Sequence, residues 1–320
     1  MALTQDTGTL IDNMLNGDVR SLSRLMTLVE REPDLVPRIM KDVYPHRRPA
    51  RRVGLSGPPG AGKSTTLGNL IKRGVDAGRK VGVLCIDPTS PLTGGAILGD
   101  RIRITEMFPA DKVFIRSVAS GDSLGGLAAA TKLHALLLEA AGCDLVLIET
   151  VGLGQVGYDI TDVAETFILL VVPESGDTVQ ILKSGIIELA DIVVVNKADR
   201  DGAGEIAETL RLSFMEPRNG WIIPVIMSVA REDKGTDEIM DALKRHLFYL
   251  REDGRLASFR SPDHDFINAV SFFIKRTLNR EFLATHPVFK SFHEKIMRGD
   301  MDPYSAAAIA MNTILGQEKQ

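Results

Sequence analysis

The chain has 320 residues, of which 44% are hydrophobic and 25% are charged, and its formal net charge is −4 at pH 7. This length allows one large domain with smaller extensions. The slightly negative charge argues against a general nucleic-acid binder. No run of 18 apolar residues and no basic-then-apolar N-terminus occurs, so we expect no membrane segment and a cytoplasmic location.

The sequence predicts three parts. Residues 1–50 carry a helical pattern that ends in a basic, proline-containing stretch, which is typical of a linker or docking collar. In residues 51–255, short apolar segments alternate with helical ones, which predicts an α/β domain with a mostly parallel central sheet flanked by helices. The strands are predicted at 53–56, 81–86, 113–117, 145–148, 167–172, 192–195 and 222–227. Residues 256–320 are predicted to form a helical arm.

The first motif follows the first predicted strand. Residues 57–64 match the phosphate-loop pattern G-x-x-x-x-G-K-[ST] at every fixed position, which predicts a P-loop NTPase. Glycines let backbone N–H groups surround a phosphate, and the next helix presents its positive N-terminus there. Lys63 is expected to reach the β- and γ-phosphates, and the Ser64 hydroxyl to bind Mg²⁺. The residues expected to contact the nucleotide are Gly57, Pro58, Gly60, Ala61, Gly62, Lys63, Ser64 and Thr65.

A second motif indicates which base is bound. An N-K-x-D signature of guanine recognition follows an apolar strand and ends at Asp199. The Asp199 carboxylate can accept hydrogen bonds from both N1–H and the 2-amino group of guanine, whereas adenine offers no such donor pair. Asn196 is expected to hold two loops together, and the Lys197 stem to lie along the ring. Ser228, which closes the next predicted strand, is expected to support the base through a backbone N–H.

Carboxylates that could hold Mg²⁺ follow two other predicted strands. Glu149 ends an apolar strand, where P-loop proteins carry a metal-holding acid, and it replaces the aspartate of the common D-x-x-G switch. Gly152 would let the backbone approach the γ-phosphate. Asp87 ends another strand and Asp100 lies in the following segment; a turn or helix-cap aspartate is the alternative for each. The predicted metal ligands are Ser64, Asp87, Asp100 and Glu149.

Beyond these motifs, the chain resembles the MeaB/ArgK family, methylmalonyl-CoA mutase-associated GTPases of the SIMIBI class. The matching segments are 17–18, 27–30, 45–46, 57–60, 87–101, 149–152, 196–199 and 302–307. The resemblance implies a GTPase that hydrolyses GTP to GDP and phosphate. It implies a chaperone that gates cofactor loading into an adenosylcobalamin-dependent acyl-CoA mutase and protects or reactivates that mutase. The cobalamin adenosyltransferase is a further implied partner.

The resemblance also implies roles for particular residues. The family has a third mobile loop that corresponds to residues 173–180, and Lys183 after it could supply positive charge to the transferring phosphoryl group. The alternative for Lys183 is a solvated lysine at a helix start. In the base-binding loop, Val229 stands where the family usually has alanine. The expected catalytic residues are Lys63, Glu149, Gln155 and Lys183.

The C-terminal arm is expected to form a homodimer interface, again from the resemblance. Phe266, Val270, Ile274, Leu278 and Phe282 recur every four residues and form an apolar stripe that needs a partner surface. The alternative is that this stripe packs on its own domain. The departures from the family pattern lie in the switch regions, so the client is expected to be methylmalonyl-CoA mutase or a related acyl-CoA mutase.

Two other function classes share parts of this pattern. A metallochaperone GTPase of the hydrogenase or urease maturation type would share the sheet and the glutamate-type switch. It requires a cysteine- or histidine-rich metal site, whereas the six histidines and two cysteines here are scattered. A small-molecule kinase would require an acceptor pocket with a catalytic base, and no sequence feature marks one.

Overall fold

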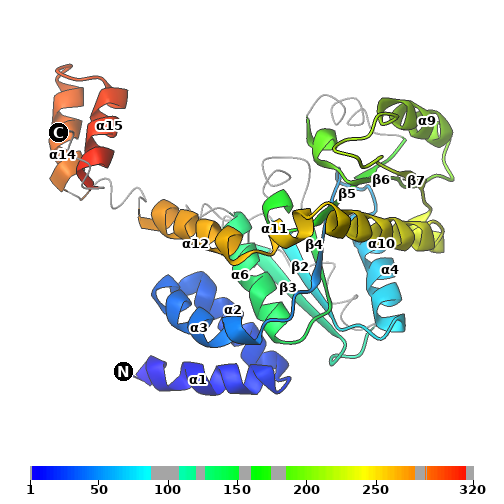
Figure 1. The fold of residues 1–320 in the computed structure, drawn as a ribbon, viewed down its shortest axis with the longest axis horizontal. Helices are drawn as coiled ribbons and strands as arrows, with labels where there is room; N and C mark the ends of the chain where they lie inside the picture. Colours follow the sequence, from blue (N-terminus) through cyan, green and yellow to red (C-terminus); the bar gives the residue numbers. More distant parts are fainter. Residues whose placement is uncertain are drawn as a thin grey trace.

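The computed structural model describes residues 2–87, 108–119, 127–150, 160–173, 185–277, 285 and 287–314. Within these residues seven strands form one sheet in the order β3-β2-β4-β1-β5-β6-β7, and every neighbouring pair is parallel (Figure 1). The strands are β1 (Arg51–Ser56), β2 (Val81–Asp87), β3 (Val113–Ala119), β4 (Leu145–Thr150), β5 (Thr166–Val171), β6 (Ile192–Val195) and β7 (Val225–Met227). The predicted parallel α/β fold is confirmed.

The prediction of the last strand was wrong at its start. A strand was expected from residue 222, but β7 begins at Val225. Pro224 has no backbone N–H and cannot donate to the ladder, although its carbonyl accepts from the Val193 N–H at 3.0 Å. Ile222, apolar in the sequence pattern, is exposed outside the strand.

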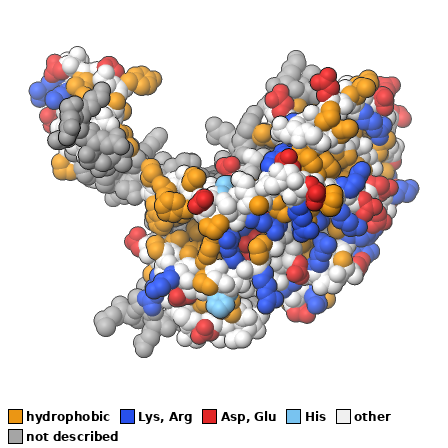
Figure 2. All heavy atoms as spheres, viewed as in Figure 1, with side chains coloured by type: hydrophobic (Ala, Val, Ile, Leu, Met, Phe, Trp, Pro, Cys, Tyr) orange, Lys and Arg blue, Asp and Glu red, His pale blue; other side chains and the backbone are white. Residues whose placement is uncertain are grey.

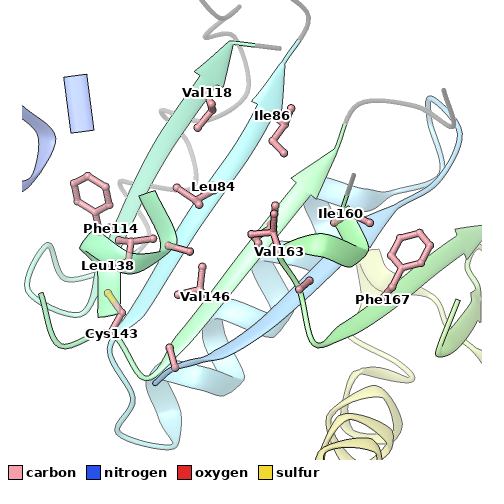
Figure 3. Close-up of a cluster of buried hydrophobic side chains, with 14 of the residues drawn as sticks. Leu84, Ile86, Phe114, Val118, Leu138, Cys143, Val146, Ile160, Val163 and Phe167 are labelled. Carbon is pink, nitrogen blue, oxygen red and sulfur yellow. The ribbon is translucent and has the colours of Figure 1, made fainter. Parts of the chain in front are cut away.

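Helices cover both faces of the sheet, since the buried strands carry apolar side chains that alternate between the two faces. Leu145 and Leu147 of β4 pack in the core under α4 (Lys63–Asp76) and α10 (Thr236–Glu252), whereas Val146 and Ile148 pack in the opposite core. Figure 3 shows part of that opposite core, whose residues come from several strands and from α6. The helices of the body are α4 (Lys63–Asp76), α6 (Leu127–Ala140), α9 (Ala203–Ser213), α10 (Thr236–Glu252) and α11 (Arg255–Phe259).

The N-terminal helices share a core with the sheet. Leu25 and Met26 of α2 (Val19–Arg31) are fully buried in the same cluster as Leu84 and Val146 of the strands. A buried ion pair at 2.9 Å joins Arg52 at the start of β1 to Glu139 of α6. The elements of this part are α1 (Ala2–Leu15), α2 (Val19–Arg31) and α3 (Val36–Val43). Short 3₁₀ helices in the described residues are η1 (Pro33–Leu35), η2 (Tyr44–His46), η3 (Ile160–Asp162), η4 (Ile186–Leu189) and η5 (Ala230–Glu232).

The C-terminal helices leave the body after α11. They are α12 (Pro262–Thr277), α14 (Pro287–Met297) and α15 (Pro303–Ile314), and Figure 1 shows α14 and α15 lying apart from the sheet. The start of α12 is tied to the body, because Asp265 accepts from Tyr44 at 2.8 Å, lies 2.9 Å from Arg47 and lies 3.2 Å from Lys132. None of the described helices is long and apolar enough to cross a membrane.

The apolar stripe of α12 does not pack on its own domain over its described part. Phe266, Val270 and Ile274 are exposed, with 69% of Phe266 accessible. A different side of α12, which includes Phe272, lines a cavity of about 220 Å³ against α3 and α6. The remaining stripe residues, Leu278 and Phe282, lie outside the described residues.

A buried histidine joins α6 to α2. The Nε2 atom of His134 lies 3.2 Å from the Met26 carbonyl oxygen and 3.3 Å from the Glu30 carboxylate. Its Nδ1 atom is buried and has no hydrogen-bond partner among the described residues. Burial, with a smaller contribution from the Arg116 guanidinium, lowers the pKa of His134 from its ordinary 6.5 to about 4. The native fold therefore favours the neutral imidazole.

We expect the free energy of unfolding to fall as the pH decreases from about 6.5 to about 4. In this window the unfolded chain binds a proton at His134 while the native chain does not, so acid favours the unfolded state. His134→Gln keeps an N–H donor toward Met26 but does not titrate, and should make the pH dependence shallower in urea denaturation. The exposed His46→Gln is the control. A His134→Gln slope equal to that of the unaltered protein would contradict this account.

Candidate functional site

The predicted phosphate loop lies between β1 and α4, at the carboxyl edge of the sheet. Gly60 and Gly62 have φ angles of +73° and +88°, which side-chain-bearing residues rarely adopt. A Cβ atom on Gly62 would lie 2.2 Å from the Asn196 amide nitrogen, so this glycine also makes room for the N-K-x-D segment. Gly62 caps α4 without a side-chain hydrogen bond. The first backbone N–H groups of α4 therefore have no side-chain cap and can face an anion.

Lys63 bends back into this loop. Its ammonium donates to the carbonyl oxygens of Gly57 at 2.8 Å and Pro58 at 2.9 Å. Burial lowers the pKa of Lys63, and the negative charge of Glu149 acts in the opposite direction. The cation is thus held at the centre of the loop, where a phosphate group would meet both its charge and the loop amides.

The two predicted metal ligands that the structure describes in full lie side by side. The Ser64 hydroxyl donates to a carboxylate oxygen of Glu149 at 3.0 Å. Glu149 is 9% exposed and lies near the end of β4, in register with Leu55 of β1 and Cys85 of β2. A hydroxyl and a carboxylate at this distance supply the hard oxygen ligands that Mg²⁺ prefers.

The side chains of the other two predicted metal ligands lie outside the described residues, so their roles stay predictions. Asp87 ends β2, but only its backbone is described, and Asp100 lies outside the described residues. Among the described residues no group of three or more His, Cys, Asp or Glu side chains is placed to hold a metal ion. The predictions for Gly152, Gln155 and Lys183 also fall outside the described residues.

Asn196 joins its own segment to the phosphate loop and to the loop after β7. The sequence predicted that it would hold two loops together. It is buried; its amide donates to the Ala61 carbonyl at 2.7 Å, and its oxygen accepts from the Ser228 hydroxyl at 3.1 Å and the Ala230 N–H at 3.0 Å. The next residue, Lys197, has a φ of +57°, an uncommon conformation for a residue with a side chain. Such conformations persist where surrounding contacts fix them, often at functional sites.

In the base loop, which begins at Ser228 after β7, the Ser228 N–H that was expected to support the base is instead bonded within the sheet. The Ser228 N–H donates to the Val195 carbonyl at 2.9 Å and extends the β6–β7 ladder, while its side chain holds Asn196. The Val229 N–H donates to the Lys234 carbonyl at 3.1 Å. A direct contact of either residue with a base stays a prediction.

Asp199 lies at the outer end of this arrangement and is paired with a residue that sequence reasoning missed. Arg231, in η5, donates to an Asp199 carboxylate oxygen at 2.7 Å. Asn69 of α4 was also missed; its amide donates to the Ala230 carbonyl at 2.8 Å. Neither residue belongs to a motif, and 161 residues separate Asn69 from Ala230, so no local pattern points to either contact.

Comparisons with known proteins agree with this arrangement. The family model described as methylmalonyl Co-A mutase-associated GTPase MeaB matches residues 22–282. A putative GTPase of Pyrococcus horikoshii is 42% identical over 313 residues, which cover 96% of this chain and 98% of the relative. The mouse protein named methylmalonic aciduria type A homolog, mitochondrial, is 32% identical over 327 residues, which cover 94% of this chain and 78% of the relative.

The solved structures give the same result for the fold. The crystal structure of an LAO/AO transport system kinase matches with a TM-score of 0.71 and 26% identity, and the match covers 97% of each chain. The family match begins within α2 and runs through the sheet to the start of the arm. The chain therefore belongs to the MeaB family of methylmalonyl-CoA mutase-associated GTPases, and it binds guanine nucleotides and hydrolyses GTP.

Proposed function

We propose that the chain is a GTP-dependent chaperone of an adenosylcobalamin-dependent acyl-CoA mutase, either methylmalonyl-CoA mutase or a close relative. In this role GTP binding and hydrolysis gate cofactor loading and protect or reactivate the mutase, and the cobalamin adenosyltransferase is a second partner. The observation that carries the proposal is the family match over residues 22–282, which includes both nucleotide motifs. The name of the mouse relative, which refers to methylmalonic aciduria, supports the same class of client.

Different residues of the site bind the phosphates and the metal ion. Lys63 and the amides at the start of α4 bind the β- and γ-phosphates and hold them in the loop. Ser64 and Glu149 are the proposed ligands for Mg²⁺, a proposal that rests on their 3.0 Å contact, with Asp87 and Asp100 as the further predicted acids. When bound, the ion neutralises charge on the transferring phosphoryl group.

The arm is proposed to form a homodimer. Figure 2 shows hydrophobic side chains gathered over α12, and Phe266, Ile267, Val270, Phe273 and Ile274 are exposed there. A contiguous apolar surface of this kind is costly to leave in water and commonly marks an interface. Between α14 and α15 lies a second apolar groove, whose lining includes Phe292 and Met311. The helices that line this groove lie apart from the sheet (Figure 1).

The phosphate-loop lysine gives the first test. Lys63→Ala should weaken GTP and GDP binding about 100-fold or more, because the phosphate charge loses its buried partner. Isothermal titration calorimetry with Mg²⁺ present measures the change. Lys72→Ala, an exposed lysine of the same helix, is the matched control. Unchanged GDP affinity in Lys63→Ala would remove Lys63 from the site.

The base-selecting carboxylate gives the second test. Asp199→Asn should weaken the binding of GTP and strengthen the binding of xanthosine triphosphate, because the amide group donates a hydrogen bond where the carboxylate accepted one. Competition between the two nucleotides measures the reversal, with the exposed Asp201→Asn as the control. If Asp199→Asn left the GTP affinity untouched, the assignment of Asp199 to the base would fail.

The client is tested in the native host. Affinity purification of the chain should recover the subunits of a cobalamin-dependent acyl-CoA mutase, identified by mass spectrometry, and the purified mutase should accelerate phosphate release from GTP. Lys63→Ala provides the background for the hydrolysis assay. Recovery of no such mutase, together with hydrolysis that methylmalonyl-CoA mutase does not change, would argue against the chaperone role while leaving the GTPase activity intact.

A further inference from the structure

The Arg231–Asp199 ion pair occupies the rim of the proposed base site. The Arg231 guanidinium is 2.7 Å from Asp199 Oδ2 and 3.6 Å from a carboxylate oxygen of Glu232, which in turn lies 2.8 Å from the Lys234 ammonium. Four charges of alternating sign therefore follow one another along this rim. Arg231 comes from the loop after β7, and Asp199 comes from the loop after β6.

The loop that carries Arg231 is fixed on both sides of that residue. Ala230 donates its N–H to Asn196 at 3.0 Å and accepts from the Asn69 amide at 2.8 Å. On the other side, the Glu232 N–H donates to the Val229 carbonyl at 2.9 Å, which closes a tight turn. The backbone of Arg231 is thus held in a constant position relative to the N-K-x-D segment.

The exposure of this ion pair indicates that it orients the Asp199 carboxylate rather than stabilises the fold. The side chain of Arg231 is 69% exposed and that of Asp199 is 30% exposed. An exposed ion pair contributes little to folding, because water screens it and two side chains lose freedom. A donor from a fixed loop also limits the rotations that the Asp199 carboxylate can adopt.

We propose that Arg231 is a positioning residue for base selection, and this rests on the proposed role of Asp199. Arg231 holds the carboxylate so that both of its oxygens face the purine edge. A carboxylate oxygen has two lone pairs, so Oδ2 can accept from Arg231 and from a guanine N–H at the same time. The pair therefore assists bidentate recognition without competing for it.

This role has a signature in nucleotide discrimination. Guanine offers Asp199 two donors, N1–H and the 2-amino group, whereas hypoxanthine offers only N1–H. A carboxylate free to rotate still finds one donor but less often aligns with two. Loss of Arg231 therefore weakens the binding of GDP more than the binding of IDP, whereas general damage to the loop weakens the binding of both nucleotides equally.

Calorimetric dissociation constants for GDP and IDP test the proposal. Arg231→Ala should lower the preference for GDP over IDP by about 1.5- to fivefold, the range of one exposed ion pair. Arg231→Lys should restore most of that preference, since it keeps the positive charge. Arg245→Ala, which removes an exposed arginine of α10, should leave the preference unchanged.

A double-mutant cycle separates this proposal from the role of Asp199 itself. In an Asp199→Asn background, Arg231→Ala should change GDP affinity by less than it does alone, because its target is gone. Suppose that Asp199→Asn weakens GDP binding, but Arg231→Ala either leaves the preference for GDP over IDP unchanged or tightens GDP binding. The positioning role of Arg231 is then wrong, and the assignment of Asp199 to the base stands. If Asp199→Asn has no effect on GDP, the base assignment fails first.

Discussion

The site depends on the three hydrogen bonds of one buried amide. Asn196 donates to the phosphate loop and accepts from the base loop, so the two halves of a nucleotide site are held at a fixed separation. A nucleotide is a long ligand whose ends need different chemistry, and its affinity depends on both ends engaging together. Because Asn196 follows a fully buried strand, the constraint passes directly to the sheet, and the core on both faces keeps that strand in place.

The parts of the site that could be predicted from the sequence are those whose residues are close together along the chain. The phosphate loop, Glu149 and the N-K-x-D segment were recognisable because each is a contiguous pattern at a strand end. The Ser64–Glu149 contact could be anticipated, because Ser64 follows the phosphate loop after β1 and Glu149 lies near the end of the neighbouring parallel strand β4. The contacts of Arg231 and Asn69 could not, because they depend on how loops from distant strands meet. The start of β7 was misplaced because apolar content outweighed the missing donor of Pro224.

The same distinction applies to the whole fold. Strand order within the sheet cannot be read from local periodicity, and neither can the placement of the N-terminal helices in a core shared with β2 and β4. Their amphipathic pattern indicated a buried face but not its partner. For α12 the pattern indicated a partner surface, and its outward apolar residues, exposed while the opposite side packs against α3 and α6, give that prediction its physical basis.

The contact between Gly62 and Asn196 couples two positions that lie far apart in the chain. Any side chain there would collide with the Asn196 amide, since the two atoms would be 2.2 Å apart. A shorter residue at 196 would relieve the collision but would leave the Ala61 carbonyl and the Ala230 N–H without their partner. A side chain at position 62 would in addition have to adopt a φ of +88°, so a change at 196 alone does not make room for one.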